Sequence, residues 1–153
     1  MSRTIEIGVK ALVVRRLFEF VKPLVAAKSG PLAVEPRLEQ IDADLHEMWR
    51  SDLQEHQAQD LRCLSRVLGP KFKKTRVLRI SAKGLEPCLR ACAAVRLRLR
   101  STELAPIDDL ELETGELETK LTSERMVGAY QTYVVLAALQ EILIRHLDPS
   151  AEE

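Results

Sequence analysis

The last long segment of the chain constrains the fold most, because its apolar residues cover most of the circumference of a predicted helix. The helix begins after Thr122 or Ser123, either of which can serve as its cap, and ends at about Leu147. A helix of this kind is normally buried on nearly all sides. We therefore predict that it is the central helix of the domain or half of a dimer interface. The candidate residues for this core or dimer helix are Tyr130, Tyr133, Leu136, Leu139 and Leu143.

The rest of the chain is long enough to cover that helix. The 153 residues are 46% hydrophobic and 30% charged, which is the size and composition of one globular domain. Because helical patterns dominate, we predict a single, mainly α domain over residues 1–153. Five to six helices would pack as a bundle-like domain around the long C-terminal apolar helix, with at most a small two-stranded β ribbon.

Two short segments alternate in the manner of strands. Ile5, Ile7 and Val9 alternate with polar or small residues over Thr4–Val9, and Thr75–Ile80 has a similar composition. We expect these segments to pair with each other. A two-stranded ribbon is only marginally stable alone, so helices should cover it.

The first half of the chain otherwise reads as helices. One runs from about Val9 to Lys28 and should be kinked or shortened at Pro23. A loop over 29–36 leads to an apolar stripe that begins at Leu38 and Ile41 and continues to Leu45 and Met48. We predict a break at Ser51, whose spacing from Gln54 fits a capping box, and a second helix over 52–68. One straight helix would rotate the stripe by roughly 100° before Leu61, Leu64 and Leu68. Trp49 closes the stripe, and we expect it to pack in the core rather than to anchor a partner.

The second half holds a further helix and an acidic segment. We predict a helix from Ala82 to about Ser101, with Cys88, Ala91, Cys92, Val95 and Leu99 on its buried face. The alternation over 95–100 also fits a strand, but no turn residue separates it from the preceding helical pattern. Residues 102–121 should form an exposed acidic loop, with a short extended piece at Leu110–Leu112. The tail over 149–153 is expected to be disordered.

The net charge of zero conceals a marked segregation. The segment 71–100 holds a candidate basic interaction face, formed by Lys71, Lys73, Lys74, Arg76, Arg79, Arg90, Arg96, Arg98 and Arg100. Lys83 is a further basic residue of the same segment. Such a face could meet phosphate or an acidic partner. We favour the simpler interpretation, in which these cations pair with the chain's own acidic segments or are solvated.

No recognisable catalytic, metal or cofactor motif is present in the sequence. Cys63, Cys88 and Cys92 have no zinc-ligand spacing with the histidines, and we expect buried thiols. His46 and His56 each follow an aspartate by one helical turn, which is more typical of a solvated face than of a metal site. His146 is placed to complement the negative end of the last helix. We therefore predict no catalytic residues, no metal ligands and no cofactor.

The order of parts resembles an uncharacterised bacterial family. A helix reading Leu85-Glu-Pro-Cys-Leu-Arg-Ala-Cys is followed by an acidic loop and by a helix reading Tyr130-Gln-Thr-Tyr-Val-Val-Leu-Ala-Ala-Leu. The family is a domain of unknown function, small and mostly helical, best represented in actinobacteria and often encoded near a Clp protease adaptor. The resemblance covers about 35–147. It implies a role near protein turnover and transfers no catalytic residues.

The expected function is a non-enzymatic protein–protein interaction or regulatory module with a protein partner, and the last helix is a candidate homodimer interface. Nucleic-acid binding by the basic face is the first alternative. A small-molecule or metal-dependent enzyme without a recognisable motif is the second. The small, odd number of cysteines, the missing signal-peptide pattern and the longest apolar run, Val134–Leu139, favour a cytoplasmic protein without a membrane span.

Overall fold

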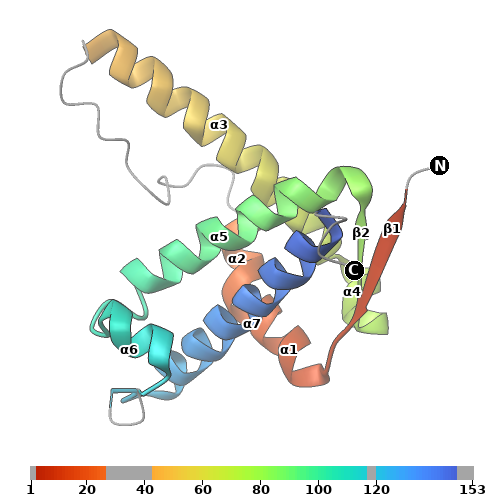
Figure 1. Ribbon diagram of the computed structural model, residues 1–153, viewed down its shortest axis with the longest axis vertical. Coiled ribbons are helices and arrows are strands. Elements are labelled where there is room, and N and C mark those ends of the chain that lie inside the picture. The colour runs from red at the N-terminus through yellow and green to blue at the C-terminus, as the bar shows by residue number, and fades with distance from the viewer. Residues whose placement is uncertain (1–2, 27–42, 117–119, 148–153) are drawn as a thin grey trace.

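The computed structural model describes residues 3–26, 43–116 and 120–147, and it has a mainly α fold with one small sheet (Figure 1). The predicted loop over 29–36, Leu38, Ile41 and the tail over 149–153 lie outside these residues. The elements, in chain order, are β1 (Thr4–Gly8), α1 (Ala11–Arg16), a π-helical turn (Leu17–Val21), α2 (Lys22–Ala26), α3 (Ala43–Val67), α4 (Pro70–Thr75), β2 (Val77–Ser81), a 3-10 turn (Ala82–Gly84), α5 (Leu85–Ser101), α6 (Asp109–Thr114) and α7 (Glu124–Leu147). The predicted fold class is confirmed.

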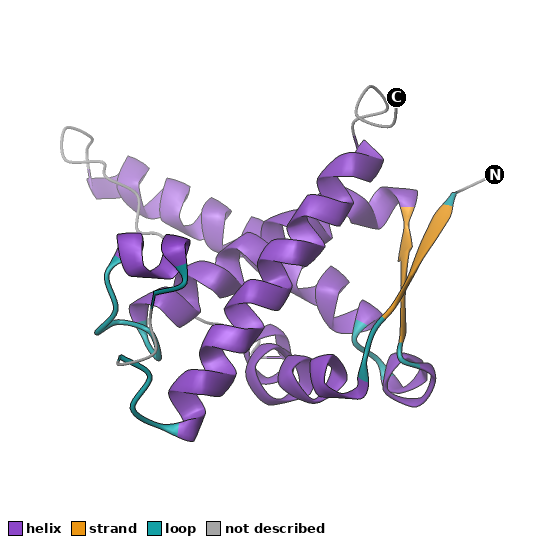
Figure 2. Cartoon of the chain, turned by 60° about the horizontal axis from the view of Figure 1, so that its bottom comes forward, coloured by secondary structure: helices purple, strands orange, loops and turns teal. Residues whose placement is uncertain are grey.

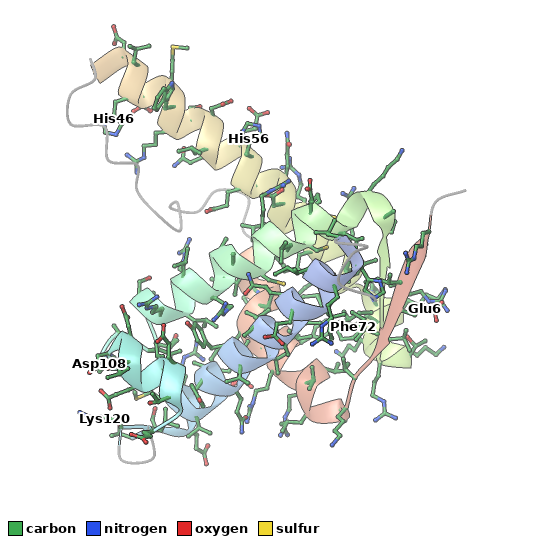
Figure 3. All side chains as sticks on the ribbon, in the orientation of Figure 1. Glu6, His46, His56, Phe72, Asp108 and Lys120 are labelled. Atoms are coloured by element: carbon green, nitrogen blue, oxygen red, sulfur yellow. The ribbon has the colours of Figure 1, made fainter. Side chains whose placement is uncertain are left out.

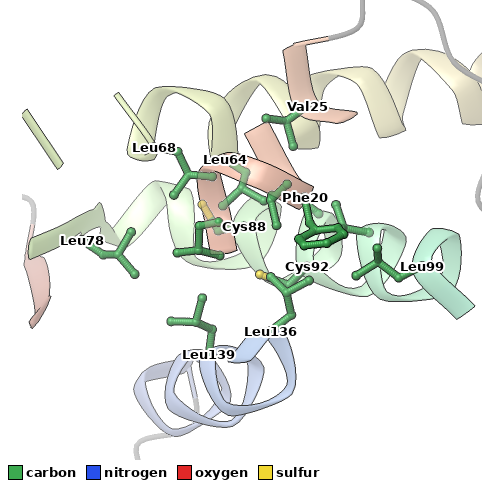
Figure 4. Packing of buried hydrophobic residues seen from close by; sticks show 14 of the residues in the cluster. Phe20, Val25, Leu64, Leu68, Leu78, Cys88, Cys92, Leu99, Leu136 and Leu139 are labelled. Carbon is green, nitrogen blue, oxygen red and sulfur yellow. The ribbon is translucent and has the colours of Figure 1, made fainter. Parts of the chain in front are cut away.

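The core lies where α5 and α7 pack together, with α1 and the π-helical turn against α7 (Figure 2). Leu143 of α7 is fully buried. So are Leu136 of α7 and Cys88 and Cys92 of α5, which meet in the core (Figure 4). The predicted buried face of α5 is therefore confirmed, as is its helical rather than extended conformation. α7 begins after Ser123, whose hydroxyl accepts a hydrogen bond from the Met126 backbone N–H at 3.1 Å.

The two predicted strands pair antiparallel, with Ile5 opposite Ile80 and Gly8 opposite Val77. The pairing continues beyond the strands, because the Ala82 N–H donates to the Arg3 carbonyl and the Val9 N–H donates to the Arg76 carbonyl. Ile5, Leu78 and Ile80 are buried in the core. The ribbon thus has the apolar cover that two strands need. The short helix α4, which the sequence did not predict, leads into β2.

Pro23 is accommodated without ending the N-terminal helical segment. The π-helical turn directly precedes α2, and the Lys22 N–H donates to the Leu17 carbonyl five residues earlier. Proline has no N–H to continue an α-helical ladder, and a π turn is one way for a helix to absorb such a mismatch. The wider turn buries Leu17, Phe20 and Val21 in the core.

The predicted break at Ser51 is wrong, because α3 continues without interruption from Ala43 to Val67. Neither glycine nor proline lies near Ser51, and the serine-to-glutamine spacing also fits the interior of a helix. Leu64 and Leu68 are buried where the end of α3 meets the domain. The N-terminal half of α3 extends beyond the domain (Figure 1).

The acidic segment is only partly an exposed loop. Leu104, Ile107 and Leu112 are buried, and 109–114 form helix α6 where we expected an extended piece. Asp108 caps this helix by accepting a hydrogen bond from the Glu111 N–H at 2.9 Å, and Gly115 ends it with a φ of 75°. Because the segment is so rich in carboxylates, the sequence analysis missed its three buried apolar residues and the two residues, Asp108 and Gly115, that begin and end α6.

Within the described residues, α7 is the one helix long and apolar enough to cross a membrane by length and composition. The core helices of globular proteins meet the same criterion. Leu136, Leu139 and Leu143 line its buried face, whereas Val134 and Ile144 are about half exposed. The candidate residues for the core or dimer helix therefore fall into a buried group and a partly buried group. The three leucines pack inside this protomer, and Tyr130 and Tyr133 are partly buried at its edge.

Candidate interaction surface

Four large apolar side chains are exposed on the N-terminal half of α3. Leu45, Met48, Trp49 and Leu53 are 47%, 65%, 51% and 44% exposed, and we call them the α3 stripe. They lie within about 140° of one another on the helix. The expectation that Trp49 packs in the core is wrong. A contiguous set of exposed apolar side chains is more informative than single ones, since isolated exposed apolar residues are normal.

The exposure of the α3 stripe follows from the rotation of the apolar pattern along a straight helix. The side of α3 that carries Leu64 packs against the domain, and the stripe is turned from it by roughly 100°. The sequence contained this signal. We used it to predict a break in the helix, whereas the helix stays straight and the stripe faces outward.

Acidic side chains border the α3 stripe on one side. Asp44, Glu47 and Glu55 lie on the helix next to Met48, and Asp52 lies within the same shallow depression as Met48 and Trp49. Asp52 approaches His56 at 3.9 Å, with both side chains largely exposed. His46 lies near the outer end of this projecting helix and His56 farther along it, towards the domain (Figure 3). The surface therefore has a negative edge, and one carboxylate, that of Asp52, lies between Met48 and Trp49 on the helix.

Arginines of α5 that belong to the predicted basic face contact other helices of the same chain. Arg90 holds Asp60 of α3 through two hydrogen bonds of 3.0 Å, and the hydrogen bond to Asp60 raises the pKa of Arg90. Arg96 donates to Gln140 at 2.6 Å and lies over the Tyr133 ring at 4.4 Å. Arg100 pairs with Asp109, and Arg98 also interacts with another group of the protein. These contacts join α5 to α3, α6 and α7.

The remaining cations cluster at the end of α4 and the start of β2. Arg79 pairs with Glu6 on the neighbouring strand at 3.7 Å. Lys71, Lys73, Lys74 and Arg76 are exposed and make no ion pair with any described residue. The same is true of Lys83 at the start of the 3-10 turn. Four of the cations without an ion pair therefore lie close together over 71–76, and Lys83 is a fifth.

The cysteines meet between α3 and α5. The Sγ atoms of Cys63 and Cys88 are 3.8 Å apart, and Cys88 and Cys92 are buried. Burial raises the pKa of Cys88, and the nearby Cys63 adds to the rise. Burial also raises the pKa of Cys92 to about 12. Thiols that hold their protons in this way are poor nucleophiles.

Raising the pH should therefore destabilise the protein through Cys92. Between about pH 9 and 12 the folded state keeps a proton that the unfolded chain has lost. The free energy of unfolding then falls as pH rises, by at most about 1.4 kcal/mol per pH unit for this thiol. Urea denaturation at pH 9, 9.5, 10 and 10.5 measures the slope. The Cys92→Ala variant should be less stable at pH 9 but show a shallower slope, and an unchanged slope would contradict this assignment.

Within residues 3–26, 43–116 and 120–147, no cluster of three or more His, Cys, Asp or Glu side chains is placed to hold a metal ion. His46, His56 and His146 are not brought together with the cysteines. The Nδ1 atom of His146 lies 3.4 Å from a guanidinium nitrogen of Arg3, close to the ribbon. A comparison of the chain with protein-family models, curated proteins and solved structures found no match.

Proposed function

We propose that the protein is a non-enzymatic interaction module that binds a protein partner through the α3 stripe. The observation that carries this proposal is the exposure of Trp49 and its three apolar neighbours on a helix that projects from the domain. Tryptophan is among the residues that most often dominate binding energy at protein interfaces. The resemblance of residues 35–147 to the uncharacterised bacterial family adds that this interaction would serve protein turnover.

The partner that best fits the α3 stripe is an amphipathic helix with basic residues beside its apolar face. A helix can lay its apolar side on the stripe through side chains three and four residues apart. Its lysines or arginines would then meet the acidic border formed by Asp44, Glu47 and Glu55, and the carboxylate of Asp52 beside Met48. Opposite charges across an interface steer the two molecules together and fix their orientation.

A second copy of the chain fits this surface less well. In an antiparallel two-fold pair of helices the same flank of each copy faces its own equivalent. The acidic border of one copy would then oppose the acidic border of the other, and like charges brought together in this way are unfavourable. This argument separates a basic partner from self-association.

Two synthetic helical peptides test the proposal, both with leucine on one face and with either lysine or glutamate on the other. Trp49 is the chain's one tryptophan, so its emission reports binding at the stripe directly. We expect the lysine peptide to shift the emission to shorter wavelengths and to bind more weakly as salt increases. The glutamate peptide should bind at least tenfold more weakly, and equal binding of both peptides would overturn the charge assignment.

Replacing Met48 and Leu53 together by serine should weaken binding of the lysine peptide by about tenfold or more, since loss of a central apolar contact costs over 1 kcal/mol. The tryptophan reporter is kept in this variant. Leu110→Ser is the matched control, because Leu110 is 68% exposed on α6, away from the stripe. Thermal unfolding should be nearly unchanged in both variants. A dimer in sedimentation analysis that Met48→Ser and Leu53→Ser dissociate would favour a second copy instead.

A further inference from the structure

A groove of 530 Å³ lies between the N-terminal helical segment and the end of α4. Its apolar wall is formed by Ala11, Val14 and Phe18, and its charged residues are Arg15, Glu19, Lys73 and Arg76. The volume lies in the range of small-molecule sites, which typically join an apolar wall to a few polar groups. This groove is separate from the α3 stripe, and no part of the proposed function uses it.

Aromatic packing gives the groove a defined wall. The Phe18 ring stacks on the Phe72 ring, with centroids 6.0 Å apart and planes inclined by 10°. Phe72 is buried, and the partly buried Phe18 packs against it. The Lys73 ammonium lies 5.4 Å from the centroid of Phe18. The aromatic wall thus attracts the Lys73 ammonium through a cation–π contact.

The charge in the groove is positive. Arg15, Lys73 and Arg76 come from two separate segments of the chain, and none of them makes an ion pair with a described residue. Glu19 is the one carboxylate that lines the groove, and it is already paired with Arg16 at 3.1 Å. Three cations therefore face a single, neutralised carboxylate.

Arg76 occupies a backbone conformation that normally selects glycine. Its φ is 59°, in the left-handed region, and it is the one described non-glycine residue with a positive φ. The Arg76 N–H donates to the Phe72 carbonyl at 2.7 Å, and the Arg76 carbonyl accepts from Val9 at 2.9 Å. Both bonds use the backbone alone, so glycine would make them with less strain. An arginine at such a position costs folding free energy, and strained residues of this kind cluster at functional sites.

We propose that this groove binds the phosphate group of a small phosphorylated ligand. Arg15 and Arg76 offer planar guanidinium groups that match pairs of phosphate oxygens, and Lys73 adds a third positive charge. The apolar part of the ligand would lie against Val14 and Phe18. A phosphate ester can come from a soluble metabolite or from a lipid headgroup, and the recognition chemistry is the same for both.

The decisive variant is Arg76→Gly, because folding and binding should respond in opposite directions. The melting temperature should rise or stay the same, since glycine relieves the left-handed strain. Binding of pyrophosphate and of ATP, measured by titration calorimetry at low salt, should weaken about tenfold, as expected for loss of a charged hydrogen bond to phosphate. Lys74→Ala is the control, because Lys74 lies beside Lys73 on α4 but does not line the groove.

A second variant and a vesicle assay complete the test. Arg15→Gln removes a cation from α1 and should weaken binding as Arg76→Gly does, without touching the left-handed residue. Phosphatidylcholine vesicles with and without phosphatidylglycerol distinguish the two sources of phosphate. Binding of ATP or pyrophosphate supports a soluble ligand, and binding of the anionic vesicles alone supports a lipid headgroup. The proposal is overturned if no probe binds at low salt, or if Arg76→Gly and Lys74→Ala bind alike.

Discussion

Replacing Leu136 by alanine is expected to lower the free energy of unfolding by about 3–4 kcal/mol. Leu136 is fully buried on α7, in the layer where α7 packs on α5 and Cys92 (Figure 4). Truncation removes apolar contacts and leaves a cavity that the surrounding helices can fill only in part. The loss is a large share of the roughly 5–15 kcal/mol that stabilises an ordinary domain.

Urea denaturation followed by far-ultraviolet circular dichroism measures this effect, since helix content reports the whole domain. Val134→Ala is the matched control, because Val134 lies two residues earlier on α7 and is 47% exposed. We expect it to change the free energy of unfolding by less than about 1 kcal/mol. Similar decreases in the free energy of unfolding for the two variants would mean that Leu136 does not pack between α7 and α5.

Gly128 should tolerate no larger side chain, although it lies inside a long helix. A Cβ atom at this position would lie 2.7 Å from Cε2 and 3.0 Å from Cζ of Phe20, which is itself buried. Replacing an interior helical glycine normally favours the helix by up to about 1 kcal/mol. Here the overlap outweighs that gain, and we expect Gly128→Val to lower the free energy of unfolding by about 2–3 kcal/mol.

A double-mutant cycle identifies the source of the Gly128 effect. Phe20→Leu removes the two ring atoms that the new side chain would meet, so the loss caused by Gly128→Val should be smaller in the Phe20→Leu background. Ala138→Val, at an exposed position of the same helix, measures the intrinsic cost of valine and should stay below about 1 kcal/mol. Additive effects of Gly128→Val and Phe20→Leu would exclude the proposed contact.

The sequence predicted those elements whose apolar pattern and end signals agree. The last helix, the buried face of α5 and the two strands all combine a clear period with a cap or a turn. Two of the wrong predictions arose where signals conflict. At Ser51 a capping pattern coincided with a rotating stripe, and at 109–114 the acidic composition hid a capped helix.

Contacts between side chains far apart in the chain could not be predicted from the sequence. The bond from Arg90 to Asp60 and the one from Arg96 to Gln140 join residues far apart in the chain, so charge counts could not show which cations are free. The groove was also invisible, because Arg15 and Arg76 come together only when the ribbon forms. The α3 stripe could have been found, since its rotation from Leu64 was already apparent in the pattern.

The position of β1 has a consequence for how the chain folds during synthesis. β1 is made early, but its partner β2 begins only at Val77, and α7, which packs on α1, begins at Glu124. A ribosome therefore releases the first strand and helix long before their neighbours exist. Contacts this distant in sequence close late and slow folding. The N-terminal segment should stay accessible to chaperones and proteases until α7 has emerged, and then lock in a single late step.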